Sequence, residues 1–152
     1  MSSQLAGVTE TRLTMSDAVS RRPDAAGKEP FKALIAHAAV YNNFTQIAAD
    51  YGAEKERFFD YWDKPEEFAR YSPHTNAGNF TTPTLVIHGQ LDRRVPVNHG
   101  IELFNILQKR GVPSRLLYYP DENHWILKPQ NSLFWYQTTR DWLATYAPPG
   151  AR

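Results

Sequence analysis

The sequence predicts a layered α/β fold, and three short apolar runs carry that prediction. The runs are "FKALIAH" at 31–37, "TPTLVIHG" at 82–89 and "SRLLYYP" at 114–120. A nearly continuous apolar run of this length is typical of a strand covered on both faces, as in a parallel sheet packed between helices. Helical segments separate the runs, and strands that alternate with helices indicate parallel, right-handed crossovers.

Turn residues and prolines mark where the first predicted elements end. The first strand is predicted to end near His37. A helical, aromatic-rich stretch follows over 40–71, interrupted at Pro65 and at "YSPH". The second strand covers 84–88 and leads into the loop "QLDRRVPV". The first half of the domain is therefore predicted to be strand, helix, strand.

A helix is predicted over 98–110, because apolar residues recur there at three- and four-residue spacing. Asn98 is predicted to cap its N-terminus, and Gly111 to take the left-handed position after its end. A third strand follows over 115–119. The loop "DENHWILKPQ" then leads to a terminal helix over 131–146.

The length of 152 residues predicts one domain with one core. Residues 1–30 are small and polar, with the Pro- and Gly-punctuated "SRRPDAAGKEP", and are predicted to be a flexible lead-in with a short helix near 15–19. The domain itself is predicted to cover 31–147, and residues 148–152 form a tail.

Composition excludes several classes of function. Seventeen Lys and Arg residues balance sixteen Asp and Glu residues, which argues against a nucleic-acid or anionic-membrane partner. The absence of cysteine excludes disulfides, thiol chemistry and Cys-based zinc sites. No apolar run approaches the roughly 20 residues of a membrane-spanning helix, and the N-terminus lacks the apolar core of a signal peptide. We therefore expect a soluble cytoplasmic protein.

Three ionisable residues follow the carboxyl ends of the predicted strands, where reactive groups collect in α/β sheets. They are His37, Asp92 and His124. Neighbouring parallel strands lie about 4.8 Å apart, so their loops can bring Asp92 and His124 into hydrogen-bond contact. An Asp that orients a His is how hydrolases build a general base. A metal site formed by these three residues with His88 is the alternative, because His and carboxylate suit zinc, although no H-E-x-x-H spacing supports it.

Other polar and aromatic residues have structural interpretations. His88 is expected to be packed or bonded to backbone, His99 to be solvated, and His74 to shape a turn. Arg93 and Arg94 are expected to shape the loop around Asp92, with phosphate or carboxylate binding as the alternative. A stacking surface for bases or sugars is the alternative use of the aromatic residues near the C-terminus. We favour a core role, because three residues one turn apart on the terminal helix must bury a face: Phe134, Thr138 and Trp142.

Longer motifs add a family resemblance over residues 31–146. The segments "YSPHTNAGNFTTP", "TPTLVIHGQLDRRVPV" and "LFNILQKRGVPSRLLYYPDENHWILKPQNSLFWYQTTRDWL" resemble the end of the catalytic domain in prolyl oligopeptidase-family serine peptidases, in particular the dipeptidyl-peptidase and acylaminoacyl-peptidase branch. The resemblance implies a partial α/β-hydrolase fold, namely the C-terminal strands of a parallel sheet with flanking helices. It also implies Asp92 as catalytic acid and His124 as catalytic base, without a cofactor. The segment 94–96 matches the one that shapes the acid loop.

One part of the family pattern is missing from this sequence. Serine hydrolases of this fold carry the nucleophile in G-x-S-x-G upstream of the acid, and no serine here has that context. Without a nucleophile and an oxyanion hole the pair has no proton to accept, so the chain alone is expected to be inert.

Two functions remain open at this stage. In the first, the chain is part of a peptidase that acts on peptides when a Ser-bearing half complements it. In the second, it is a non-catalytic module that homodimerises or docks on a relative through the exposed sheet edge formed by residues 31–37, since unpaired strand edges are templates for pairing. A third possibility is the remnant of a truncated hydrolase that folds poorly.

Overall fold

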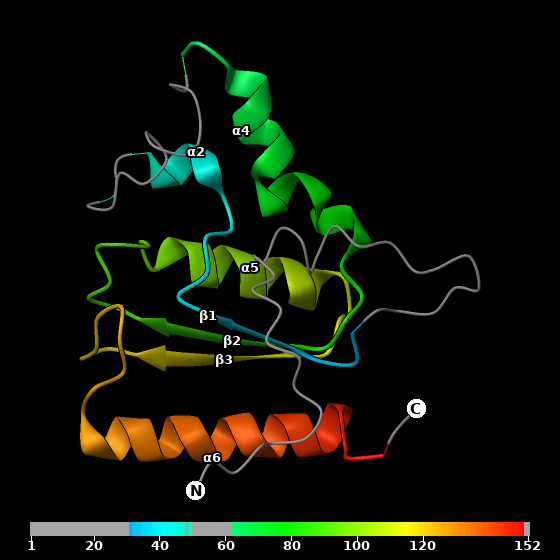
Figure 1. The fold of residues 1–152 in the computed structure, drawn as a ribbon, viewed down its shortest axis with the longest axis vertical. Helices are drawn as coiled ribbons and strands as arrows, with labels where there is room; N and C mark the ends of the chain where they lie inside the picture. The colour runs from blue at the N-terminus through cyan, green and yellow to red at the C-terminus, as the bar shows by residue number, and fades with distance from the viewer. Residues whose placement is uncertain (1–30, 48, 50–61, 151–152) are drawn as a thin grey trace, which may run out of the picture.

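A computed structural model of the chain describes residues 31–47, 49 and 62–150 (Figure 1). The predicted lead-in of residues 1–30, with its short helix, lies outside the described residues. So do residues 50–61 of the predicted helical stretch and the last two residues of the predicted tail. Among the described residues, no helix combines the length and apolar character needed to cross a bilayer.

Three parallel strands form the sheet, in the order β1-β2-β3. They are β1 (Leu34–His37), β2 (Thr84–Gly89) and β3 (Ser114–Tyr119). In register, His37 lies opposite Ile87, and Gly89 lies opposite Tyr119. Every residue of the central strand β2 is buried, as its continuous apolar run predicts. The predicted α/β fold with a parallel sheet is confirmed.

Two long helices cover the sheet, one on each face (Figure 1). They are α5 (Asn98–Lys109) and α6 (Pro129–Tyr146). Successive side chains of a strand point to opposite faces, so β2 contributes to both layers. Val86 packs in the cluster on the α5 side, whereas Leu85 and Ile87 pack in the cluster on the α6 side.

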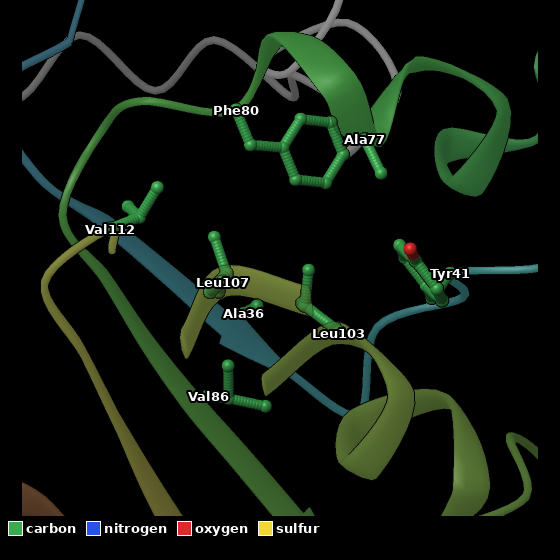
Figure 2. Packing of buried hydrophobic residues seen from close by; sticks show 8 residues of the cluster. All are labelled: Ala36, Tyr41, Ala77, Phe80, Val86, Leu103, Leu107 and Val112. Carbon is green, nitrogen blue, oxygen red and sulfur yellow. The ribbon is translucent and has the colours of Figure 1, made fainter. Parts of the chain in front are cut away.

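The two cores follow from this alternation. Figure 2 shows the buried residues of the first, which joins the α5 face of the sheet to the β1–β2 connection: Ala36, Tyr41, Ala77, Phe80, Val86, Leu103, Leu107 and Val112. The second joins the other face to α6: Leu85, Ile87, Leu117, Tyr119 and Trp142. Leu85 and Ile87 are fully buried, and each such side chain contributes about 1.5–3 kcal/mol relative to exposure.

The connection from β1 to β2 contains short helical elements above α5. They are α2 (Asn43–Gln46), α4 (Pro65–Tyr71) and the 3-10 helix η1 (Pro73–Asn79). Pro65, predicted to interrupt a helix, instead begins α4, because a proline in the first turn loses no hydrogen bond. The helix ends before Ser-Pro as predicted, whereas η1 was not predicted.

Two details of the helices differ from the sequence expectation, namely the role of Asn98 and the burial of Phe134. Asn98 is the first residue of α5 and not its cap; its side-chain amide donates to Glu102 at 3.2 Å. Gly111 has the predicted positive φ, +70°. On α6, Phe134 is 47% exposed, so its predicted core position is wrong, while Thr138 and Trp142 are buried as expected.

Candidate functional site

Asp92 and His124 lie in hydrogen-bond contact beyond the carboxyl ends of β2 and β3. The distance from His124 Nδ1 to Asp92 Oδ2 is 2.9 Å. The carboxyl group is fully buried, and the imidazole side chain is 26% exposed. Since an ionised carboxylate only accepts, Nδ1 carries the proton in this contact. The lone pair of the ring then lies on Nε2, which is the form a general base needs.

The loop after β2 wraps its own backbone around the carboxylate of Asp92. The N–H groups of Arg94 and Val95 both donate to Oδ1, each at 2.9 Å. Burial alone raises the pKa of Asp92, but hydrogen bonds from His88, from the Val95 N–H and from His124 outweigh it and lower the pKa to about 2. The carboxylate is therefore ionised at neutral pH, beside a ring that it orients.

Two buried side chains hold this loop from its outer side. His88, at the end of β2, lies with Nε2 2.8 Å from the Val95 carbonyl oxygen. Gln46, from α2, donates to the Arg94 carbonyl at 2.7 Å. The expectation that His88 bonds to backbone is confirmed, and Arg94 shapes the loop through its main chain as predicted. No sequence signal pointed to Gln46, because its partner lies 48 residues away.

The loop that carries His124 is closed by a buried carboxylate, Glu122. Its oxygens accept from the N–H groups of Leu127 at 3.1 Å and Lys128 at 2.9 Å, and from the amide of Asn131 at 2.8 Å. Burial raises the pKa of Glu122, and these hydrogen bonds more than offset it, so the pKa is lowered. The sequence shows two adjacent acids before His124 but gives no means of choosing which one is buried.

The two loops are also joined to each other through main chain. The N–H of Gln90 donates to the Tyr119 carbonyl at 2.8 Å, and the N–H of Leu91 donates to the Glu122 carbonyl at 2.9 Å. These bonds extend the β2–β3 pairing past the end of the sheet. The loop that carries Asp92 and the loop that carries His124 therefore form one continuous backbone unit.

His99 is fully buried, so the expectation that it is solvated is wrong. Its Nδ1 accepts from the backbone N–H groups of Tyr41 at 3.1 Å and Asn42 at 3.3 Å. Its Nε2 lies 3.1 Å from the hydroxyl of Thr45. Burial lowers its pKa to about 4, so the ring is neutral at pH 7. His99 thereby holds in place the segment from which Gln46 donates to the loop that carries Asp92.

His37, the last residue of β1, is the third ionisable residue predicted at this edge of the sheet. Burial lowers the pKa of His37, with further lowering from His124 and His88, but its Nε2 has no hydrogen-bond partner among the described residues. Ser72 is buried, accepts from the Asn43 N–H at 2.8 Å and lies 2.7 Å from His74 Nδ1. This contact lies where the chain passes from α4 to η1, which agrees with the expectation that His74 shapes a turn. In the described part of the chain, no group of three or more His, Cys, Asp or Glu could hold a metal ion.

An exposed aromatic lies beside the pair. The ring of Trp125 contacts His124 edge to face, with centroids 5.4 Å apart. The guanidinium of Arg94 lies 5.1 Å from the Trp125 ring centroid, within the range of a cation–π contact. Both loops thus also meet at the surface.

Curated proteins with similar sequences are all named as dipeptidyl-peptidases in the two examples that follow. A probable dipeptidyl-peptidase 5 of Emericella nidulans is 43% identical over 125 residues, which is 80% of this chain and 17% of that protein. Dipeptidyl-peptidase 5 of Porphyromonas gingivalis is 40% identical over 124 residues, which is 74% of this chain and 18% of that protein. The chain thus spans less than a fifth of the length of these relatives.

Solved structures share the fold. The acylaminoacyl peptidase of Pyrococcus horikoshii superposes with a TM-score of 0.73 at 22% identity, over 80% of this chain and 21% of that one. A puromycin-hydrolyzing peptidase of Mycobacterium tuberculosis gives 0.73 at 16% identity, over 86% of this chain and 20% of that one. The expected partial α/β-hydrolase fold is therefore confirmed.

A family model provides the assignment. The model described as the prolyl oligopeptidase family matches residues 25–149, which include every described strand and helix. This match agrees with the curated relatives and with the fold of the solved structures. The chain belongs to the prolyl oligopeptidase family.

Proposed function

We propose that this chain supplies the acid and the base of a Ser-Asp-His triad that hydrolyses peptide bonds. Asp92 is the acid and His124 is the base. The observation that carries the proposal is the 2.9 Å contact between a buried, ionised carboxylate and Nδ1 of a partly exposed imidazole. The relatives are named as peptidases, which supports peptides as the substrate class.

The chemistry follows from the tautomer of His124. Its Nε2 takes the proton of the serine hydroxyl as that oxygen attacks the carbonyl carbon of the substrate. Asp92 stabilises the imidazolium that forms, and the proton then passes to the leaving amine as the C–N bond breaks. Water attacks the resulting acyl-enzyme by the same route in reverse, releasing the acid and the free serine.

The nucleophile and the oxyanion donors come from outside this sequence, since it holds no G-x-S-x-G. Within the described residues β1 has a neighbour on one side only. A strand that pairs with the other side of β1 would deliver its own carboxyl end to the edge where Asp92 and His124 lie. A Ser-bearing strand at this position is the partner that we propose.

Complementation tests the proposal. The chain is co-expressed with the Emericella nidulans relative from which the matched segment has been deleted, and the purified complex is treated with a fluorophosphonate probe. We expect labelling of the partner only when this chain is present, and its loss with His124→Ala. A complex that co-elutes but is never labelled would contradict the proposed function.

The edge of β1 that pairs with no described strand supports one further candidate, a non-catalytic module that pairs with a second copy of itself. Size-exclusion chromatography with light scattering distinguishes the two, because a monomer across the micromolar range removes this candidate. A broad, uncooperative thermal melt would instead support the remnant of a truncated hydrolase.

The cytoplasm remains our prediction for the compartment of the chain. Fractionation of cells that express the tagged chain tests it.

A further inference from the structure

His88 is the last residue but one of the central strand β2 and lies on the face covered by α5, where it is almost completely buried. The backbone of Gly100 in α5 packs directly against its ring. A Cβ added at Gly100 would lie 2.6 Å from His88 Nδ1. Helix and strand therefore fix the imidazole in one orientation.

The contacts of the ring define its protonation. Nε2 lies 2.8 Å from the carbonyl oxygen of Val95 and 3.4 Å from Oδ2 of Asp92. A carbonyl oxygen only accepts, so Nε2 carries the proton. Nδ1 is buried and has no hydrogen-bond partner in the described part of the chain. A proton on Nδ1 would lack an acceptor there, so the ring donates from Nε2.

We infer that His88 is a positioning residue, which keeps the carboxylate of Asp92 in place for His124 by holding the Val95 carbonyl. This inference rests on the proposed function, because it names a residue that serves the same acid and base. His88 touches neither the reacting serine nor the substrate in that scheme. It acts on Asp92 through Val95, whose N–H donates to Asp92 and whose carbonyl accepts from His88, and directly through Nε2, which lies 3.4 Å from Asp92 Oδ2.

The geometry explains why a donor is needed at this position. His88 lies four residues before Asp92, and its ring bridges from the strand end to the far side of the loop that encloses the carboxylate. An apolar side chain of similar size fills the same space but leaves the buried Val95 carbonyl without a donor. An unpaired buried carbonyl is unfavourable, so the loop moves it toward another donor. That movement displaces the Val95 N–H, and the Asp92 Oδ1 atom that accepts from it moves as well.

Three substitutions separate positioning from space filling. His88→Gln places an amide N–H where Nε2 lies, whereas His88→Asn places it where Nδ1 lies, a position with no partner among the described residues. His88→Met fills space without a donor. Each variant is labelled with 15N-histidine, and long-range 1H–15N correlation spectra give the ratio of the Nδ1–H to the Nε2–H tautomer of His124. Circular dichroism and urea unfolding check that each variant folds.

We expect the wild type and His88→Gln to hold His124 in the Nδ1–H form. In His88→Met and His88→Asn the tautomer ratio should fall roughly tenfold, the scale set by a hydrogen bond to a charged group. A wild-type ratio in His88→Met would overturn the inference, because space filling would then suffice. Should His88→Met not fold, His88→Gln against His88→Asn decides: equal ratios overturn the inference, and a high ratio in His88→Gln alone supports it.

These measurements use the chain by itself and need no activity. Failure of the complemented enzyme to label would count against the proposed function and would leave the tautomer comparison intact. In a complex that labels, His88→Met should slow labelling at saturating probe, with the affinity for the probe unchanged, and His88→Gln should restore the rate. A change in affinity alone would contradict positioning.

Discussion

A Cβ atom on Gly89 would lie 2.3 Å from the carbonyl oxygen of Asn123, so the end of β2 touches the backbone of the loop that carries His124. The carbonyl oxygen of Glu122 is almost as close, at 2.5 Å. Both contacts involve main chain, which cannot rotate away as a side chain can. The proximity of Asp92 and His124 therefore depends on a residue with no side chain at position 89.

Gly89→Ala should destabilise the protein by about 1–3 kcal/mol, the range for inserting atoms into a packed region. It should also push the His124 loop away from Asp92. Urea unfolding gives the first quantity, and the His124 tautomer ratio gives the second. Gly78→Ala is the matched control, since no atom of the described residues outside its chain neighbours lies within 4 Å of its added Cβ. Equal stability of the two variants would contradict the close approach at Gly89.

Glu122→Gln should destabilise the chain, whereas Asp121→Asn should change stability little. The amide introduced by the first substitution would point an N–H group at one of the three donors from which the Glu122 carboxylate now accepts. That leaves buried groups unpaired, at a cost of about 1–3 kcal/mol. Asp121 is exposed, and its bond to Lys128 lies at the surface. Chemical unfolding of both variants at pH 7 measures the difference, and the opposite ranking would refute the role of Glu122.

Asp92 should make stability depend on pH in the acid range. Its folded pKa of about 2 lies below the ordinary value of 3.8, so its contribution is fully present above 3.8 and is lost as the pH falls toward 2. In Asp92→Asn this component is absent, and stability should fall less steeply over that interval. Unfolding free energies at a series of pH values check this. Parallel curves for the two proteins would show that Asp92 has an ordinary pKa.

His99 should make stability depend on pH over a higher range than Asp92 does. Stability should again be lost as the pH falls. The folded pKa of about 4 lies below the ordinary 6.5, so the unfolded chain binds a proton that the folded chain excludes, and stability falls as the pH drops from 6.5 toward 4. His99→Asn keeps an acceptor near Nδ1 and removes the titration, so its curve should be flatter there. His37 and His74 titrate in both proteins and cancel in the comparison. Identical slopes would contradict a buried neutral His99.

The sheet and its two covering helices were predictable because burial on both faces leaves a direct trace in sequence. The apolar run at 84–88 and the helical spacing after Asn98 each describe an element whose neighbours demand that pattern. The contact of Asp92 with His124 followed from a general rule, since adjacent parallel strands deliver their loops to one edge. Family motifs then singled out these two side chains among all the loop residues.

The side chains that hold Asp92 and His124 in place could not be predicted from the sequence, and the reason is physical. His99 is a polar residue in the first turn of α5, which suggested exposure, but its partners belong to a segment nearly sixty positions earlier. Gln46 likewise bonds a carbonyl oxygen, which any residue type could present. Phe134 failed for a different reason, because residues four apart are rotated by roughly 40° around a helix, which puts Phe134 roughly 80° away from the buried Trp142.

Asp92, His124, His88 and Glu122 with its three donors all lie between Thr84 and Asn131. That stretch is a single uninterrupted strand–helix–strand unit with its two closing loops. A genetic rearrangement that moves it whole therefore transplants the hydrogen-bonded pair with most of its scaffold. A breakpoint inside it separates donor from acceptor, however much of the surrounding domain is retained.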